Sequence, residues 1–427
     1  MMTTIALVLN LLLLLYLGWG ALYQLTFAVA GIFYRPLKVI PTPLAANLDD
    51  YLRIKVFIPA YREDVVILHT AGEARKQQYP HAQYQVEVIA DQLQPETLQK
   101  LRALPVGVTE VHFEKSTKSK ALNVALHAST NDAHTINFEQ GAAVGVGSAG
   151  SPPPFFEPDI AVILDADNVM APDFLQRVNH HFHQGVRVLQ GQRAAKNQQT
   201  GMALLDAASE SANNHILCRG HRVLGLSARL AGSGMAFEYA FFKKAMSGID
   251  VVGGFDKALE LYCTENRVKI AYDELAIVYD EKVSASASFA RQRSRWIAAQ
   301  FDFAKQNLPK SIPALLRGNI DFFNKSIQMA LPPRLLLPGL LFIGMILNAI
   351  AGSVWMWGWA LAFAANVLSY AIALPGFVFA YKNLHLWLQI PVAFWATIRA
   401  MMRMKEARKK FIVTPKTVIH TNPEQPV

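Results

Sequence analysis

The amino-terminal segment constrains the fold most, because the first 34 residues carry no charged side chain. From Ile5 to Phe33 nearly every residue is apolar, and this run exceeds the ~20 residues that a helix needs to cross a bilayer. A cleaved signal peptide would have a basic start and an apolar core of ~7 to 15 residues, and neither feature is present. The sequence therefore predicts a membrane-spanning anchor over residues 1–34.

A second uncharged run extends from Leu335 to Tyr381, which is about twice the length of one span. Asn348 and the pair Gly352-Ser353 interrupt it, so we expect a transmembrane hairpin over residues 335–381. The third apolar stretch, Leu384 to Met402, either spans the membrane or lies in its interface.

A basic tail follows the third stretch and bears on this choice. It contains Arg403, Lys405, Arg408, Lys409 and Lys410. Lys and Arg stay on the cytoplasmic side of a membrane, and with one anchor and one hairpin the tail is cytoplasmic only if the third stretch does not cross. We expect an interfacial helix and a cytoplasmic tail over residues 382–427, with a fourth span as the alternative.

Composition supports a membrane protein with a soluble part. Hydrophobic residues make up 52% of the chain and charged residues only 17%, which is too apolar for an ordinary soluble protein. The net charge of +9 favours contact with anionic membrane lipid, and no aromatic and basic motif typical of nucleic-acid binding is visible. Cys218 and Cys263 are too few for a disulfide framework, so we expect packing residues in a reducing compartment.

The segment 35–286 has the pattern of an α/β domain. Strand-like runs at 53–60, 85–90, 106–113, 160–164 and 186–190 alternate with helical segments, and shorter runs follow at 269–272 and 276–279. This alternation predicts a parallel sheet that binds its ligand at the carboxyl ends of the strands. Thr130 to Pro158 is rich in Gly, Ala, Ser and Pro, and fits a surface insertion better than a core element or a functional lid.

Acidic residues end the most apolar of these runs. The segment from Ile160 to Leu164 stops at Asp165 and Asp167, which only Ala166 separates. Hard divalent cations take oxygen ligands and share them with phosphate, so this pair fits a metal bound to a diphosphate. Taken alone, such a pair is more often an ordinary turn.

Three further segments are open to both structural and functional interpretations. The turn at Gly232, Ser233 and Gly234 suits close approach either by a ligand or by another backbone segment. Asp256 and Glu260 share one face of a predicted helix start, where a helix cap and a solvated acid are the structural alternative. The arginine-rich run at 291–296 fits either a membrane-surface face or a clamp for a diphosphate.

Together, in this order along the chain, these segments resemble the membrane-embedded family 2 glycosyltransferases. That group contains the cellulose, chitin and hyaluronan synthases and the ceramide glucosyltransferases. The resemblance covers roughly residues 56–296, and its marks are Pro59-Ala60-Tyr61-Arg62-Glu63, Asp91, Lys118 to Asn123, Asp165-Ala166-Asp167, Gly232-Ser233-Gly234, Gly253-Gly254-Phe255-Asp256, and Gln292-Arg293-Ser294-Arg295-Trp296 as a QxxRW signature.

The resemblance implies a fold and a set of site residues. The fold would be a cytoplasmic GT-A type Rossmann-like domain joined to α-helical transmembrane and interfacial helices, with QxxRW in the interfacial segment 287–334. The nucleotide sugar, most simply a UDP-sugar, would be bound by Pro59, Tyr61, Glu63, Asp91, Lys120, Asp165, Gln292, Arg293 and Arg295. Gly232, Ser233, Gly234 and Trp296 would bind the acceptor. Asp165 and Asp167 would hold Mg²⁺ or Mn²⁺ on the diphosphate.

The chain departs from the family pattern at the catalytic base. The synthases place the base as the Asp of a Thr-Glu-Asp triplet, which is missing here. Counting back from Tyr272 favours Asp256, and Glu260 is the alternative.

The resemblance implies an inverting, metal-dependent transferase that extends a β-linked polysaccharide at the cytoplasmic face of the cell membrane. The alternative is an enzyme that glycosylates a lipid once. A non-enzymatic membrane sensor is disfavoured because the acidic pair and QxxRW are intact. The expected partners are a nucleotide sugar, a growing glycan or lipid acceptor and membrane lipid. Because few spans enclose little room for a sugar chain, a polymerising enzyme would need a homo-oligomer or a separate export partner.

Overall fold

The computed structural model describes residues 2–37, 39, 47–127, 136–138, 141–146, 157–197, 200–251, 253–282, 286–381, 383, 386 and 389–402. The chain divides into two compact units. We call residues 36–197, 229–282 and 408–427 the sheet unit, and residues 1–35, 198–228 and 283–407 the helical unit.

The sheet unit is built on one sheet with the strand order β4-β5-β3-β2-β1-β6-β9-β8-β10-β7. Its strands are β1 Ile54–Tyr61, β2 Tyr84–Asp91, β3 Gly107–His112, β4 Ile136–Phe138, β5 Gly141–Val146, β6 Ile160–Ile163, β7 Val169–Met170, β8 Val188–Ala195, β9 Met235–Glu238 and β10 Ile270–Asp280. Parallel pairing joins β3, β2, β1 and β6 in sequence and joins β8 to β10. The remaining neighbours pair antiparallel.

The prediction of a purely parallel sheet is therefore wrong, because β9 runs antiparallel between β6 and β8. Two further expectations also need correction. Part of the Gly- and Ala-rich segment forms β4 and β5, and β5 pairs with β3 at the sheet edge. The two short strands expected near the end of the domain are one strand, β10, whose register shifts between Asp273 and Ile277.

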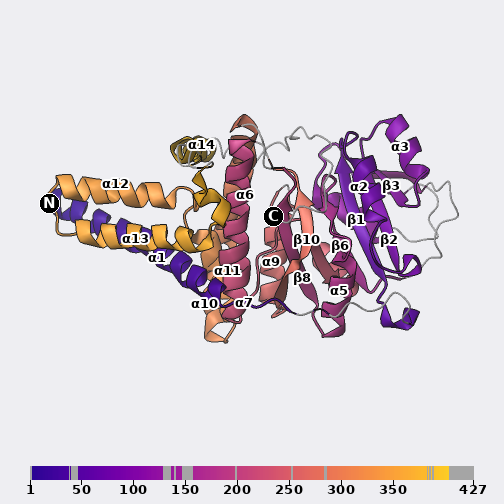
Figure 1. Ribbon diagram of the computed structural model, residues 1–427, viewed down its shortest axis with the longest axis horizontal. Coiled ribbons are helices and arrows are strands. Elements are labelled where there is room, and N and C mark those ends of the chain that lie inside the picture. Colours follow the sequence, from indigo (N-terminus) through magenta and orange to yellow (C-terminus); the bar gives the residue numbers. More distant parts are fainter. Residues whose placement is uncertain are drawn as a thin grey trace. The chain divides into compact units, whose positions relative to one another are not determined.

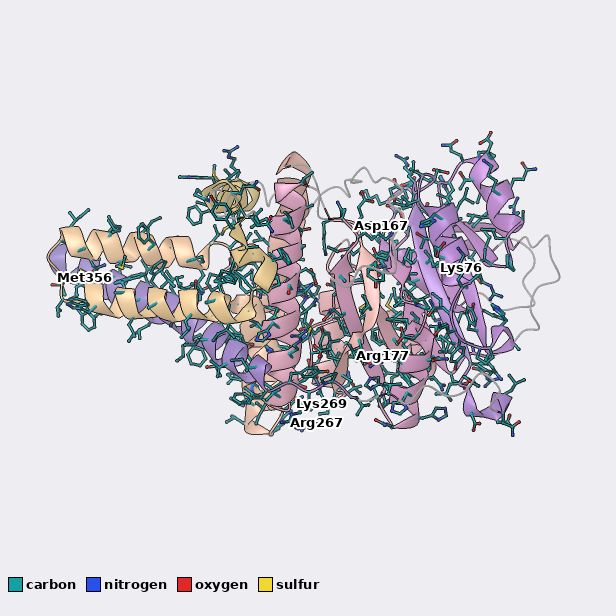
Figure 2. All side chains as sticks on the ribbon, in the orientation of Figure 1. Lys76, Asp167, Arg177, Arg267, Lys269 and Met356 are labelled. Atoms are coloured by element: carbon teal, nitrogen blue, oxygen red, sulfur yellow. The ribbon has the colours of Figure 1, made fainter. Side chains whose placement is uncertain are left out.

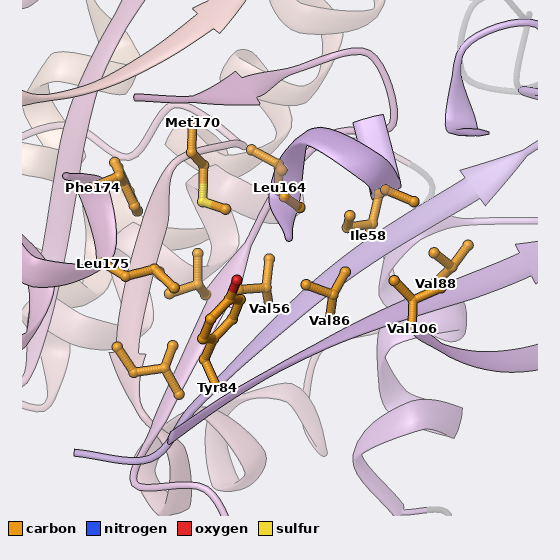
Figure 3. Close-up of a cluster of buried hydrophobic side chains, with 14 of the residues drawn as sticks. Val56, Ile58, Tyr84, Val86, Val88, Val106, Leu164, Met170, Phe174 and Leu175 are labelled. Carbon is orange, nitrogen blue, oxygen red and sulfur yellow. The ribbon is translucent and has the colours of Figure 1, made fainter. Parts of the chain in front are cut away.

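The core of the sheet unit follows from buried β-branched side chains on the central strands. Val56 and Ile58 of β1 and Val86 of β2 are fully or almost fully buried, as expected for strands covered on both faces. Figure 3 shows these side chains together with Phe174 and Leu175 of α5 in one cluster. The helices of this unit are α2 Ile67–Ala74, α3 Pro95–Arg102, α4 Lys118–His127, α5 Phe174–His183, α8 Tyr239–Met246 and α9 Phe255–Glu265.

The helical unit contains the apolar segments. Its helices are α1 Met2–Ile32, α6 Gly201–Asn213, a π-helix at Asn214–Gly220, α7 His221–Val223, α10 Ser286–Leu316, α11 Ile320–Ala330, α12 Leu337–Ile350, α13 Met356–Ala373 and α14 Ile390–Met402. In Figure 1, α1, α12 and α13 run side by side. Leu17 and Ala21 of α1 are buried there in one cluster with Leu337, Leu341 and Trp359.

Among the described residues, two helices, at Thr4–Ile32 and Met356–Ala373, are long and apolar enough to cross a membrane. The other helices of the apolar region are shorter, since α12 has 14 residues and α14 has 13, against the ~20 that one span needs. The basic tail from Arg403 onward lies outside the described residues.

Candidate active site at the carboxyl edge of the sheet

The turns that follow β1 and β2 form one end of the site. The last residues of these strands, Tyr61 and Asp91, are register partners. Arg62 and Gln92, which come next, both have φ of 55°, a left-handed conformation that is uncommon for residues other than glycine. The Arg62 Nε donates a hydrogen bond of 2.9 Å to Gln92 Oε1, which joins the two turns. Backbone strain of this kind is concentrated at ligand sites.

Asp91 is almost completely buried at this position, with 1% of its surface exposed. The Ser116 hydroxyl donates a hydrogen bond to Asp91 Oδ2, whereas Oδ1 has no hydrogen-bond partner among the described residues. Burial raises the pKa of Asp91, and the hydrogen bond from Ser116 opposes that shift only in part. A buried carboxylate oxygen that accepts no hydrogen bond is costly unless a ligand supplies a donor.

The Asp165 carboxylate lies one strand further along, directly after β6. The Lys118 ammonium, in the first turn of α4, forms an ion pair with Asp165 and donates a 2.7 Å hydrogen bond to Gly232 O. The same ammonium lies 4.8 Å from the centre of the Phe255 ring, at the start of α9. Lys118 therefore joins three segments of the site, and Asp165 has a cationic partner.

The turn at Gly232, Ser233 and Gly234 packs against the acidic pair. The Asp165 N–H donates a 3.0 Å hydrogen bond to Ser233 Oγ, and Gly232 and Gly234 have φ of 85° and 63°. A Cβ atom at Gly234 would lie 2.8 Å from Val278 Cγ2. Backbone conformation and close packing therefore both require glycine at position 234. Of the two interpretations of this turn, this supports close approach by another protein segment rather than by a ligand.

Asp167 lies at the carboxyl edge of the sheet and retains 7% of its surface exposed. Figure 2 labels it there, away from Arg177. Asn168, which follows it, is completely buried. With the Asn168 amide nitrogen facing the acids, it donates to Asp167 Oδ1 at 3.0 Å and to Asp280 Oδ1 at 3.1 Å, and the amide oxygen accepts from Ser233 Oγ at 2.7 Å.

Cations surround Asp280 at the end of β10. Arg193 and Lys282 both form ion pairs with its Oδ2 atom, the second at 2.8 Å. Burial opposes ionisation, but these two cations hold the pKa of Asp280 well below its usual range. Lys196 also reaches this region, where its ammonium donates to the backbone carbonyl of Asp167.

The two acids of α9 have different surroundings. Asp256 lies in the first turn of the helix and is half-buried, next to the Phe255 ring that contacts Lys118. Glu260 is completely buried, and its Oε2 atom accepts a 3.0 Å hydrogen bond from the Leu230 N–H. This environment gives Glu260 a structural role in anchoring the 230 turn. Asp256 is the more accessible of the two acids.

The structure brings together Tyr61 with Asp91, and Asp165 and Asp167 with Gly232, Ser233 and Gly234. Pro59 and Glu63 flank the first turn, and Lys120 is only partly buried, with its backbone N–H bonded to Thr117 Oγ1. Gln292, Arg293, Arg295 and Trp296 belong to α10, but their side chains lie outside the described residues.

Sequence reasoning missed several residues of this edge: Lys118 as the partner of Asp165, and Asn168, Arg193, Lys196, Asp280 and Lys282. Lys118 could have been found, because it shares the first turn of α4 with Lys120. The others come from strand ends far apart in the chain, and no local pattern marks them.

The acidic pair fits a hard divalent cation by its chemistry. Asp165 offers carboxylate oxygens, and its ion pair with the Lys118 ammonium shows that this position accepts a cation. Among the described residues, no group of three or more His, Cys, Asp or Glu side chains is arranged to hold a metal ion. A metal bound to Asp165 and Asp167 would therefore complete its coordination with oxygens of a ligand and water, as Mg²⁺ does when it is bound through phosphates.

The mixed sheet, with acids at its carboxyl edge, is the fold of GT-A glycosyltransferases. The mannosyltransferase PcManGT from Pyrobaculum calidifontis, solved with GDP-mannose and Mn²⁺, is similar over 92% of this chain and 97% of its own, at a TM-score of 0.53 and 17% identity. TarS residues 1–349 from S. aureus match over 83% of this chain and 91% of that chain at a TM-score of 0.38 and 14% identity. Glucosyl-3-phosphoglycerate synthase from Mycobacterium tuberculosis matches over 53% of this chain and 71% of its own, at a TM-score of 0.32 and 15% identity. The fold comparison rests on the first of these three.

The family itself is shown by the sequence. Residues 53–299 match the family model described as glycosyltransferase like family 2. The chain belongs to this family and is a glycosyltransferase. Comparison with curated protein sequences gave no match.

Proposed function

We propose that this glycosyltransferase uses a nucleotide sugar, a UDP-sugar, to extend a β-linked polysaccharide by inverting transfer. The observation that carries the proposal is the ion pair of Lys118 with Asp165, two residues before Asp167, at the carboxyl edge of a sheet in which β2 ends in the buried Asp91. This edge is where α/β sheets bind nucleotides. The alternative acceptor is a lipid that receives one sugar.

The nucleoside would lie against the turns after β1 and β2. Tyr61, Glu63 and Asp91 would hold the base and ribose, with Pro59 shaping the turn. Asp91 Oδ1, which has no donor among the described residues, would accept a hydrogen bond from a base N–H or a ribose hydroxyl. Binding would then relieve the cost of burying this oxygen.

The diphosphate would lie over Asp165 and Asp167. Mg²⁺ or Mn²⁺ held by these carboxylates would neutralise the charge that develops on the departing diphosphate. Lys118, already at Asp165, would contact the same phosphates, and Lys120 lies in the same helix turn. Gln292, Arg293 and Arg295 of the QxxRW segment would also bind the diphosphate, because guanidinium groups bind phosphate bidentately.

Proton transfer falls to Asp256 in this proposal. Its carboxylate would accept the proton of the acceptor hydroxyl while that oxygen forms a bond to the anomeric carbon, and the bond from that carbon to the nucleoside diphosphate breaks. Burial of Glu260 and its hydrogen bond to Leu230 favour Asp256 over Glu260 for this role. Gly232, Ser233, Gly234 and Trp296 would bind the acceptor.

The helical unit would hold the enzyme in a cell membrane, with the catalytic domain in the cytoplasm. α1 and α13 are long enough to span, and the shorter α12 would complete a hairpin with α13. The length of α14, 13 residues, favours an interfacial position over a fourth span. An oligomer or a separate export partner would provide a path for a polymer.

The experiment is to incubate the purified protein with each UDP-sugar, and with GDP-sugars, in Mg²⁺ or Mn²⁺, and to size the products. A processive enzyme must hold each new terminal sugar, and an aromatic face such as Trp296 supplies flat apolar contact for that purpose. We expect a ladder or high polymer from the wild type and shorter products from Trp296→Ala. A single organic-soluble product from the wild type would show that the product is a glycolipid and not a polymer. Absence of transfer from every donor would refute the proposed function.

A further inference from the structure

Asn168 follows Asp167 in the sequence, and its side chain is hydrogen-bonded to Asp167 of the acidic pair and to the groups around it. Its side chain is completely buried, and each of its polar atoms faces a group of the site. The nitrogen donates to Asp167 Oδ1 at 3.0 Å and to Asp280 Oδ1 at 3.1 Å. The oxygen accepts from Ser233 Oγ at 2.7 Å, and Ser233 Oγ accepts from the Asp165 N–H at 3.0 Å. One amide therefore connects both acids of the pair.

The anchor of this arrangement is Asp280 at the end of β10. Arg193 from β8 and Lys282 both hold its Oδ2 atom, so the other oxygen, Oδ1, faces Asn168 in a fixed direction. Asp280 is itself 6% exposed, so water does not compete strongly for these contacts. Asp280, itself held by Arg193 and Lys282, thus fixes the orientation of the Asn168 amide.

Only an amide meets all of these demands at this position. The two N–H groups of one amide nitrogen donate to Asp167 Oδ1 and to Asp280 Oδ1 at the same time. A carboxylate there would place a third negative charge between two others, and an apolar residue would leave two buried acids without this donor. A neutral side chain with two donors and one acceptor fits the three surrounding groups.

We propose that Asn168, anchored by Asp280, is the positioning residue that orients Asp165 and Asp167 toward the divalent cation. This inference rests on the proposed function, because it assumes that the two acids bind the metal. Asn168 itself contacts neither the cation nor the donor. Groups that orient metal ligands in this way typically change metal affinity by 10- to 100-fold when removed.

The test measures Mn²⁺ binding directly, by the loss of the free Mn²⁺ electron paramagnetic resonance signal, on the full chain with UDP and, separately, with GDP. We expect Asn168→Ala to weaken Mn²⁺ binding ~10-fold or more. Ser233→Ala, which removes only one hydroxyl, should weaken it less and in the same direction. Thermal unfolding of each variant is recorded in parallel.

Asn179→Ala is the matched control. Asn179 of α5 is also a buried asparagine: its Oδ1 atom accepts from the Leu52 N–H at 2.9 Å and from the Tyr79 hydroxyl at 3.0 Å, and its amide nitrogen donates to the Asp50 carbonyl at 3.2 Å. None of these partners contacts Asp167 or Asp280 in any described hydrogen bond. At a comparable loss of thermal stability, Asn179→Ala should leave Mn²⁺ affinity within ~2-fold of the wild type, whereas a purely structural role for Asn168 would make the two variants alike.

The outcomes distinguish failure of the positioning role of Asn168 from failure of the proposed function. If the wild type binds Mn²⁺ and Asn168→Ala binds it equally well, the positioning role is refuted and the proposed function stands. If Asn168→Ala and Ser233→Ala bind Mn²⁺ no more weakly than Asn179→Ala, the role is refuted as well. If the wild type binds no Mn²⁺ with either nucleotide, the metal-dependent function fails and the inference fails with it.

Discussion

The two units of this chain distribute polar and apolar side chains in opposite ways. In the sheet unit, Val56 and Ile58 are completely buried, and ionised groups gather at the strand ends. In the helical unit, apolar side chains point outward: Leu12 is 58% exposed and Leu361 is 74% exposed. The polar groups that these helices bury include the Asn366 amide and the Ser369 hydroxyl, both at 0%.

Under the proposed function, the two units would meet two different solvents. A sheet with a buried aliphatic core and charged edges is organised by water, through the hydrophobic effect. Helices with apolar outer faces and inward hydrogen bonds are typical of lipid, where polar groups must be satisfied within the protein. In the helical unit, Asn10 and Asn348 exchange hydrogen bonds at 3.2 and 2.9 Å, and Trp359 donates to Asn10 at 3.1 Å. In the proposed function the sheet unit uses the polar groups at its carboxyl edge for chemistry, whereas these helices use theirs to pack against one another.

Asp167→Asn tests the first half of this comparison and should have the largest effect. It removes one ligand charge at a strand end without changing core packing, so we expect transfer to fall ~1,000-fold or more, since a metal contributes several kcal/mol to the transition state. Activity is measured by product formation, and folding by thermal unfolding. Asp173→Asn, which neutralises an acid that makes no helix-cap hydrogen bond, is the control and should retain activity. Near-normal turnover in Asp167→Asn would contradict the metal assignment.

The acids of α9 give the next largest effect. Asp256→Asn should reduce transfer ~100-fold or more and leave donor binding intact, because loss of a general base affects the chemical step. Glu260→Gln should instead lower the melting temperature, since the charge accepting the Leu230 N–H is lost from a buried site. Donor binding is measured by calorimetry. The opposite pattern, with catalysis lost at Glu260 and stability at Asp256, would exchange the two roles.

Asp273 tests whether buried ions of the sheet unit away from the site serve stability alone. It accepts hydrogen bonds from Arg177 at 2.8 and 2.9 Å and from His181 at 3.0 Å. Asp273→Asn should cost about 3–5 kcal/mol of stability, since it leaves Arg177 buried without its charge partner. Asp159→Asn, at an exposed pair with Arg53, should cost about 1 kcal/mol or less.

The same carboxylate predicts a pH dependence. Burial opposes its ionisation, but the hydrogen bonds from His181 and Arg177 lower the pKa of Asp273 below its ordinary value. Its contribution to stability is therefore complete above the unfolded pKa of ~3.9, and is lost as the pH falls below that value through the lowered folded pKa. Denaturant unfolding between pH 6 and ~3 should show a smaller pH dependence in Asp273→Asn than in the wild type. An equal slope in both proteins would contradict the role of Asp273.

Leu12→Lys tests the second half of the comparison and should have the smallest effect. A lysine at the centre of a spanning helix costs about 2.5–3.5 kcal/mol on insertion, so the variant should partly leave the membrane fraction after alkaline extraction. Val65→Lys is the matched control in the sheet unit, where an equally exposed apolar residue meets water, and should change stability by only about 0.5 kcal/mol. Unchanged extraction of Leu12→Lys would show that the outer face of α1 meets water or protein.

The local features of this chain follow from its amino-acid sequence alone. Apolar runs predicted β1, β2, β6 and the long helix α1, because hydrophobic periodicity and length follow from the backbone geometry of each element. The acids at the carboxyl ends of β2 and β6 marked the ligand edge, because carboxyl ends of parallel strands meet there. The family could be named from the order of these local segments.

Which of two neighbouring side chains faces the site depends instead on tertiary packing. Lys118 rather than Lys120 reaches Asp165, and Glu260 turns inward while Asp256 does not, because the direction of a helix face depends on what the helix packs against. The antiparallel insertion of β9 between β6 and β8 brings Ser233 to Asp165. Asn168 and Asp280 meet although more than a hundred residues separate them, since strand order is set by pairing over the whole sheet and leaves no local trace in the sequence.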